Sequence, residues 1–252
     1  MVRESVNLTL IIFVSFNMKT ALESDMQNST PPRLQVPPQN IVIAGIQGAG
    51  KGTYGKNRLT PREGYEIYES STKMAESRFG QQTLEMRKNG IMVPDEIPLT
   101  LLSEYLDFRS RYAETLLNGS KETALRTIFD GMPRTVTQKK GFDDLLDSKG
   151  REPAIAVQLH VKDETAWSNI HHRASKPNAR ADDKDLGAIK RRIQSFHEQT
   201  APLLEAYDKE GRLIVIDAEP KLDLNKATEE ETQAAFEVIY TRLVKAINDK
   251  TA

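Results

Sequence analysis

The stretch Gly45-Ile46-Gln47-Gly48-Ala49-Gly50-Lys51-Gly52-Thr53 follows directly on the apolar run Ile41-Val42-Ile43-Ala44. An apolar run that ends in glycines predicts a buried strand that turns into a loop and then a helix. Glycines let the backbone curl so that several amide hydrogens point inward, and a lysine placed as Lys51 is can reach the terminal phosphates of a nucleotide. The stretch therefore predicts a nucleoside-phosphate site. A glycine-rich turn without a ligand is the alternative, and the position between strand and helix disfavours it.

The residue after the lysine departs from the general pattern of such loops. The pattern places Ser or Thr directly after the lysine to hold magnesium, whereas here Gly52 takes that place and Thr53 follows. On its own the loop is compatible with ATPases, GTPases and kinases, so the rest of the chain has to narrow the function.

The composition is that of an ordinary globular protein. The 252 residues, 38% hydrophobic and 28% charged, predict one elaborated domain. A net charge of -1 gives no general attraction to nucleic acid or anionic lipid, so we expect no nucleic-acid partner and no membrane partner. The absence of cysteine excludes disulfides and thiolate zinc sites and fits a reducing compartment, so we expect a cytoplasmic protein.

Residues 1–39 differ from the rest. The apolar run at 8–16 is too short to span a membrane, and it lacks the charged start and the small-residue cleavage site of a signal peptide. We therefore expect either a disordered extension or a start upstream of the true first residue, which would be Met18 or Met26. The folded domain is expected to span residues 40–252.

After the loop, candidate strands and helices alternate. Short apolar runs predict strands at residues 41–44, 65–69, 127–130, 154–161 and 213–217. Helical spacing of apolar residues predicts a helix around Leu99, Leu102 and Leu106, a second helical stretch that closes at Ala124-Leu125, and a helix around Phe236, Ile239, Leu243 and Ile247. The alternation predicts a doubly wound α/β fold, a five-stranded parallel sheet with helices on both faces. Two polar segments, 71–95 and 171–185, are expected to lie over the mouth of the site at the carboxyl ends of the strands.

A second constellation follows the predicted strand at 127–130. Asp130 ends that strand, and Arg134 and Gln138 follow it. Asp130 could orient the water shell of magnesium, an ion that takes few protein carboxylates, and Arg134 could clamp a phosphate with two parallel hydrogen bonds. A strand-ending turn with a surface ion pair is the alternative, and the neighbouring loop makes it the weaker one.

Residues 171–192 carry a local positive charge. They contain seven lysines and arginines against three acids, the basic residues being Arg173, Lys176, Arg180, Lys184, Lys190, Arg191 and Arg192. A solvated charged helix and loop is the ordinary meaning of such a run. Arginines can also stabilise the negative charge that spreads over a phosphoryl group in transfer. The four histidines predict no metal site, because His171 and His172 are adjacent and cannot share one metal on a helix face.

Five blocks in order resemble the nucleoside monophosphate kinases, most closely the adenylate kinase family in its short-lid form. They are the loop through Gly52-Thr53; Ser71-Thr72; Gly80 with residues 90–96; residues 130–135 with Gln138; and residues 180–183 followed by Arg192 and residues 198–203. The resemblance implies a P-loop fold with a monophosphate-binding segment at 71–103 and a lid at 169–185. It also implies a monomer that transfers the γ-phosphoryl group of ATP reversibly to AMP, giving two ADP, with Mg²⁺ and without zinc.

The resemblance further implies a role for each matching residue. Catalysis would rest on Lys51, Arg134, Arg173, Arg180, Arg192 and Asp130. ATP would be bound by Gly45, Gln47, Gly48, Ala49, Gly50, Lys51, Gly52, Thr53, Asn169 and Arg173. AMP would be bound by Thr72, Arg78, Met92, Val93, Gly131, Arg134, Gln138, Arg180 and Arg192. Asp182 and Asp183 would brace the lid, and magnesium would be held through waters near Asp130 and Thr53, without a direct protein ligand.

The chain departs from the family pattern in the segment that would hold the acceptor. The helix after Thr72 is about two turns shorter, so that Arg78 would have to replace the expected phosphate-binding arginine. Lys73 and Asn169 stand where the family has a glycine and an arginine. Two alternatives follow: a kinase for another monophosphate, such as UMP or CMP, and a nucleotide-binding module of weak activity.

Overall fold

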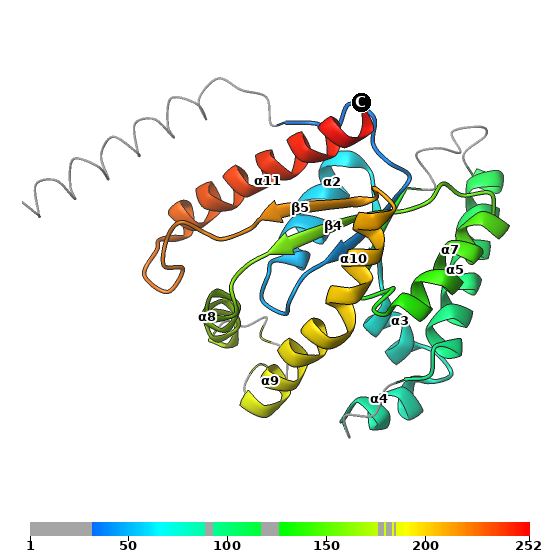
Figure 1. Cartoon of the computed structure of the whole chain (residues 1–252), viewed down its shortest axis with the longest axis horizontal. Coiled ribbons are helices and arrows are strands. Elements are labelled where there is room, and N and C mark those ends of the chain that lie inside the picture. Colours follow the sequence, from blue (N-terminus) through cyan, green and yellow to red (C-terminus); the bar gives the residue numbers. More distant parts are fainter. Residues whose placement is uncertain (1–31, 89–92, 117–125, 176–178, 180–182, 184) are drawn as a thin grey trace, which may run out of the picture. The chain divides into compact units, whose positions relative to one another are not determined.

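A five-stranded, all-parallel sheet forms the centre of the protein, in the order β2-β3-β1-β4-β5 (Figure 1). The computed structural model describes residues 32–88, 93–116, 126–175, 179, 183 and 185–252. The strands are β1 (Asn40–Ala44), β2 (Glu66–Glu69), β3 (Thr127–Asp130), β4 (Ile155–His160) and β5 (Leu213–Asp217). All five predicted strands are thus confirmed, and their ends differ from the predicted ones by at most one residue.

The helices of the described residues alternate with the strands. They are η1 (Gly52–Leu59, a π-helix), α2 (Thr60–Glu63), α3 (Ser70–Glu76), α4 (Gly80–Lys88), α5 (Glu96–Leu116), α7 (Val136–Ser148), α8 (Asp163–Ala174), α9 (Leu186–Ser195), η2 (Phe196–Thr200, a π-helix), α10 (Ala201–Lys209) and α11 (Glu229–Thr251). The predicted helical leucines lie in α5, and the apolar set near the chain end lies in α11. Ala124-Leu125 lies outside the described residues.

The two faces of the sheet carry separate hydrophobic cores. Along β1, Ile41 and Ile43 belong to one core, and Val42 and Ala44 belong to the other, as the two-residue period of a strand requires. The first core is completed by η1, α8, α9 and α11, and the second by α5, α7 and α10. Figure 1 shows α11 on one side of the sheet and α5 and α7 on the other. The predicted doubly wound α/β fold is confirmed.

The polar segment between β2 and α5 contains two helices, α3 and α4. Its sequence fits the main core poorly because it has a small core of its own, in which Met74 of α3 is buried with Ile97 and Leu101 of α5. Val93 packs against this cluster. The segment is therefore anchored to α5 through these apolar contacts.

One compact unit spans Leu34–Ala252. Leu34 is buried, and its main-chain nitrogen donates a hydrogen bond to Glu63 Oε2 at 3.2 Å. Residues 1–31, which hold most of the predicted extension, lie outside the described part of the chain. Within the described residues, no helix is long and apolar enough to cross a membrane.

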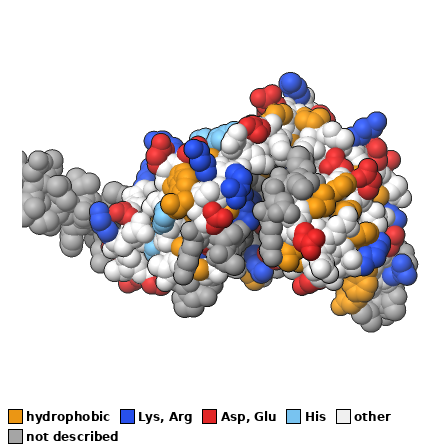
Figure 2. Space-filling view, turned by 90° about the horizontal axis from the view of Figure 1, so that it is seen from below, with side chains coloured by type: hydrophobic (Ala, Val, Ile, Leu, Met, Phe, Trp, Pro, Cys, Tyr) orange, Lys and Arg blue, Asp and Glu red, His pale blue; other side chains and the backbone are white. Residues whose placement is uncertain are grey.

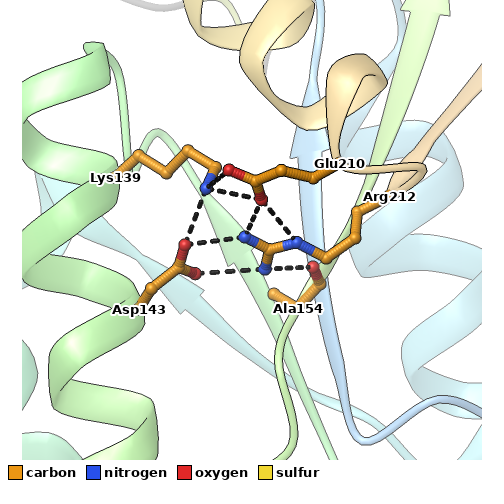
Figure 3. Close-up of polar contacts among 5 residues, drawn as sticks. All are labelled: Lys139, Asp143, Ala154, Glu210 and Arg212. Carbon is orange, nitrogen blue, oxygen red and sulfur yellow. Dashed lines mark hydrogen bonds and ion pairs between the residues drawn. The ribbon is translucent and has the colours of Figure 1, made fainter.

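A cluster of charged side chains joins α7 to the chain between α10 and β5 (Figure 3). Lys139 Nζ contacts Asp143 Oδ2 and Glu210 Oε1, each at 2.7 Å. Arg212 Nη2 contacts Asp143 Oδ2 at 2.7 Å, the guanidinium also pairs with Glu210, and Arg212 Nη1 donates to the Ala154 carbonyl at 3.1 Å. Two cations and two anions thereby connect α7 to the chain between α10 and β5, and Arg212 also contacts the residue that precedes β4.

Candidate active site

The loop predicted to bind phosphates lies between β1 and η1, at the carboxyl end of the central strand. Gly48 has a φ of +93°, and a Cβ there would lie 2.5 Å from the main-chain oxygen of Ala166 in α8, so only glycine fits. The ammonium group of Lys51 curls back over the loop and donates to the carbonyl oxygens of Gly45 at 2.7 Å and Ile46 at 3.2 Å. The loop therefore holds a cation at its centre.

The remaining residues of the loop support this curl. Ala49 is buried, and its main-chain nitrogen donates to the Ile46 carbonyl at 3.1 Å. The Gly50 carbonyl accepts from the Tyr54 main-chain nitrogen at 3.0 Å. Gly52 and Thr53 form the first turn of η1, so the positive end of a helix meets the loop, as the sequence predicts.

Asp130 ends β3, the neighbour of β1, and pairs in register with Ile43 of β1 and Glu69 of β2. It therefore lies at the same edge of the sheet as the loop. Within the described residues no side chain or main-chain group donates a hydrogen bond to its carboxylate. A carboxylate that is partly exposed and unpaired beside a phosphate loop suits the water shell of a magnesium ion. The described residues contain no group of three acidic, histidine or cysteine side chains that could hold a metal directly.

The turn after Asp130 places Arg134 and Gln138 at the start of α7. Gly131 has a φ of +81°, and a Cβ there would come within 3.1 Å of the Arg134 guanidinium, whose Nε donates to the Gly131 carbonyl at 2.9 Å. The Gln138 side-chain oxygen accepts from the Arg134 main-chain nitrogen at 2.8 Å, and its amide nitrogen donates to Asp95 Oδ1 at 2.7 Å. Asp95 thus fixes a residue that the sequence assigns to the monophosphate.

A chain of polar contacts links α8 and α9 to the loop. Arg192 of α9 donates to Gln47 Oε1 at 3.2 Å, and Gln47 Nε2 donates to Asp183 Oδ1 at 3.4 Å. Asp183, only 1% exposed, receives Arg173 Nε at 2.8 Å and Nη2 at 2.6 Å. The structure therefore brings Arg173, Arg192 and the predicted lid residue Asp183 to the phosphate loop.

The predicted lid begins inside a helix. Residues 169–174 are the last turns of α8, and Asn169 Nδ2 donates to the carbonyl oxygen of Gly48 at 2.9 Å. Asn169 therefore touches the loop directly, in keeping with its predicted place in the ATP site. Arg180 and Asp182 lie outside the described residues.

The predicted monophosphate residues before α5 are less closely gathered. Thr72 Oγ1 lies 3.5 Å from Glu69 Oε2. Arg78 is exposed and pairs with Glu104 of α5, with Nη2 2.8 Å from Oε1, and this hydrogen bond holds the pKa of the Glu104 carboxyl below its ordinary value. Val93 packs on the small core of α3 and α5, and Met92 lies outside the described residues.

Basic side chains gather around a hollow in the middle of the face seen in Figure 2. The arrangement of loop, unpaired carboxylate and arginines is suited to binding and transferring phosphates. A family model described as adenylate kinase matches residues 43–212, more than half of the chain. The chain belongs to the adenylate kinase family.

Individual members of the adenylate kinase family match most of the chain. An adenylate kinase from Parabacteroides distasonis is 29% identical over 218 residues, which cover 83% of this chain and 98% of the relative. One from Phocaeicola vulgatus is 32% identical over 178 residues, covering 69% and 86%. One from Phenylobacterium zucineum is 30% identical over 188 residues, covering 73% and 92%. The resemblance predicted from the five blocks is confirmed, and the chain is a phosphotransferase of the nucleoside monophosphate kinase class.

Some residues that shape the site of this adenylate kinase family member were not predicted. Asp95 holds Gln138, and Glu104 holds Arg78. Asp95 lies within the block at residues 90–96, whose position next to a site was visible in the sequence. No sequence pattern indicated Glu104 as the partner of Arg78, because an acidic residue on an exposed helix resembles any solvated charge.

Proposed function

We propose that this chain transfers the γ-phosphoryl group of magnesium-bound ATP reversibly to AMP, giving two ADP, with the residues assigned from the sequence. The observation that supports it most is the meeting of the Lys51 loop, the Asp130 carboxylate and the Arg173–Asp183–Gln47–Arg192 chain at one edge of the sheet. Ligands of open parallel sheets bind at this edge.

On the ATP side, the residues of the loop bind the phosphate chain. Lys51 exchanges the loop carbonyls that hold its ammonium group for phosphate oxygens, which carry more negative charge. Arg173 and Arg192 already lie beside the loop, and they stabilise the negative charge of the moving group. When bound, Mg²⁺ neutralises part of the phosphate charge, and Asp130 and Thr53 would hold its water shell.

On the AMP side, the assigned residues within the described chain are Thr72, Arg78, Val93, Gly131, Arg134, Gln138 and Arg192. Met92 and Arg180 are assigned to the same site and lie outside the described residues. Arg134 is fixed beside the strand end by Gly131 and Gln138. Gln138 reads the base by turning its amide from Asp95 to the ligand, and Arg78 leaves Glu104 to bind the phosphate. No general base is needed, because the oxygen of AMP that attacks is already an anion. The protein therefore contributes positioning, exclusion of water and stabilisation of charge.

The segment at 71–103 serves as the monophosphate-binding part and the segment at 169–185 as the lid of a kinase domain that spans residues 40–252. The protein acts as a cytoplasmic monomer without zinc, as the resemblance implies.

The proposal is tested by the formation of diphosphates from MgATP and each of AMP, GMP, UMP and CMP by the purified chain. We expect AMP to be the best acceptor, with kcat/KM at least about tenfold above the others, since a site built to hydrogen-bond one base loses that much with a base that cannot pair. UMP or CMP as the best acceptor would contradict the assignment of AMP. Tight binding of MgATP and AMP without any transfer would refute the proposed activity.

A further inference from the structure

Arg58 of η1 donates hydrogen bonds from all three of its side-chain nitrogens, although the residue is only 6% exposed. Nε donates to Glu237 Oε1 at 3.0 Å, and Nη2 donates to Gln233 Oε1 at 2.9 Å, both on α11. Nη1 donates to the main-chain carbonyl oxygen of Thr53 at 3.2 Å. A buried guanidinium requires partners, and these partners join α11 to the first turn after the phosphate loop.

Two aromatic rings also hold the guanidinium of Arg58 in position. Its central carbon lies 5.9 Å from the centre of the Tyr54 ring and 5.4 Å from that of the Phe236 ring, and the two rings meet edge to face at 6.1 Å. Cations over aromatic faces are attracted by the negative charge of the ring. Arg58 is therefore held in one orientation, with Nη1 directed at the Thr53 carbonyl.

The acceptors on α11 are held in place by other residues. Arg62 donates to both carboxylate oxygens of Glu237, at 2.7 and 2.8 Å. The hydrogen bond from Arg62 holds the pKa of Glu237 below its ordinary value, against the effect of burial, so the carboxylate is charged at neutral pH. Gln233 donates from its amide nitrogen to Glu229 Oε1 at 2.8 Å, which leaves its oxygen for Arg58. α11 thus offers Arg58 a fixed pair of acceptors.

The contact to Thr53 follows from the form of η1. This helix is a π-helix along its whole length, so its main-chain hydrogen bonds join residues five apart, and π-helical turns are frequent at functional sites. Arg58 is five residues after Thr53, so its side chain returns to the turn that carries the loop residues Gly52 and Thr53.

We propose that Arg58 is a positioning residue of the ATP site: it anchors the first turn of η1 to α11 and so sets the place of the loop amides that receive the phosphates of ATP. The inference rests on the proposed function, because it takes the loop as the ATP site. Arg58 itself is buried between η1 and α11, and it acts on the loop through the carbonyl of Thr53. Within the described part of the chain, its hydrogen-bond partners all belong to η1 and α11, so we expect its effect to be confined to ATP and to spare AMP.

Arg62 supplies a matched control. It pairs with the same carboxylate of Glu237 through two hydrogen bonds, and its guanidinium lies 4.6 Å from the Tyr240 ring, but its bonds lead to α11 and not to Thr53. Arg58→Met and Arg62→Met therefore both remove a cation from the η1–α11 contact. Arg62→Met leaves Arg58 with its own hydrogen bonds to Glu237, Gln233 and Thr53, so only Arg58→Met releases the loop.

The experiment measures initial rates of the full chain and both variants, with MgATP varied at saturating AMP and then AMP varied at saturating MgATP. For Arg58→Met we expect kcat/KM for MgATP to fall about tenfold, the effect of one lost hydrogen bond from a charged donor, with KM for AMP within about twofold of the parent. For Arg62→Met we expect both values to stay within about twofold of the parent, although the unfolding temperature falls. Equal kinetic losses in the two variants, equal losses for ATP and AMP, or no loss in Arg58→Met would each overturn the proposal.

A milder variant covers the case in which Arg58→Met does not fold. Gln233→Ala removes one anchor of Arg58 from an exposed position, and we expect the same selective loss for MgATP at about threefold, a smaller loss because Glu237 and the Thr53 carbonyl still bind Arg58. Unchanged kinetics for MgATP in that variant would count against the proposal. If the parent chain itself forms no ADP, the proposed function fails, and the variants are compared by calorimetric binding of MgATP. Weaker binding in Arg58→Met alone then supports the positioning role, and equal binding refutes it.

Discussion

Replacing Arg212 by methionine tests whether the charge cluster of Figure 3 stabilises the fold. Arg212→Met keeps much of the side-chain volume but leaves Asp143 and Glu210 with Lys139 as their only cation in the cluster. Removing one partner of a buried ion pair costs about 3–5 kcal/mol. The side chains of Asp143 and Glu210 are 26% and 44% exposed, so water compensates part of the loss and we expect about 2 kcal/mol.

The assay is urea-induced unfolding at pH 7, followed by the fluorescence of Trp167, the only tryptophan. A loss of about 2 kcal/mol also lowers the unfolding temperature by roughly 4–8 °C in a chain of this size. Lys245→Met is the matched control, because Lys245 pairs with Asp249 at the same 2.7 Å but with side chains 73% and 63% exposed. We expect that variant to lose less than about 0.5 kcal/mol.

The pH dependence gives an independent reading of the same cluster. Burial alone would raise the pKa of the Asp143 carboxyl, but hydrogen bonds from Arg212 and Lys139 outweigh it and hold the pKa below its ordinary value, and the same balance lowers that of Glu210. A carboxyl whose pKa is lowered in the folded state stabilises the fold at pH values above its unfolded pKa. This stabilisation is lost as the pH falls through the folded pKa. The difference in the free energy of unfolding between the parent and Arg212→Met should therefore have its full size at pH 7 and become smaller below about pH 4. Equal losses in Arg212→Met and Lys245→Met, or a difference that does not change with pH, would refute the reasoning.

The remaining predictions concern the site. Gly48→Ala forces a Cβ against the Ala166 carbonyl at a positive φ, so calorimetry should show MgATP binding weakened roughly tenfold or more, and unchanged affinity would remove the loop from the phosphate site. Arg78→Ala should raise KM for AMP about tenfold while stability changes little, because its pair with Glu104 is exposed; an unchanged KM would show that Arg78 does not bind the acceptor. Chelation of magnesium should abolish transfer, and Asp130→Asn should lower kcat about 100-fold at saturating Mg²⁺, with activity near that of the parent counting against its role.

The centre of the sheet could be predicted from the sequence because β1 and β3 are buried on both faces. The run Ile41–Ala44 is apolar and ends at glycine, and Ile128 and Phe129 stand between two polar residues, so the sequence pattern indicates both the conformation and the length of these strands. The helices in the segment at 71–95 were harder to predict, because α3 and α4 bury few apolar residues. Met74 contacts its partners Ile97 and Leu101 only in the folded protein. A polar helix on a small core gives little periodic signal.

Site residues could be predicted where the residue types of a motif and its position after a strand indicate a specific chemistry. Lys51 and Asp130 follow buried strands, and the order of neighbouring parallel strands brings them to one edge. Arg58 could not be predicted, because a lone arginine in a helix resembles a solvated charge and its partners on α11 lie 175 and 179 residues away in the chain. Contacts between residues so far apart in the chain depend on tertiary packing, which a local sequence pattern does not indicate.

The central claim is that the loop around Lys51 binds the phosphates of ATP and is required for phosphoryl transfer to AMP. The most direct measurement is the initial rate of ADP formation from MgATP and AMP by the purified chain, by Lys51→Met and by Lys245→Met. We predict a rapid, AMP-dependent rate for the parent and for Lys245→Met, and a rate lower by roughly 100-fold or more for Lys51→Met, the usual effect of losing a phosphate clamp. A rate of Lys51→Met within a few-fold of the parent would contradict the account.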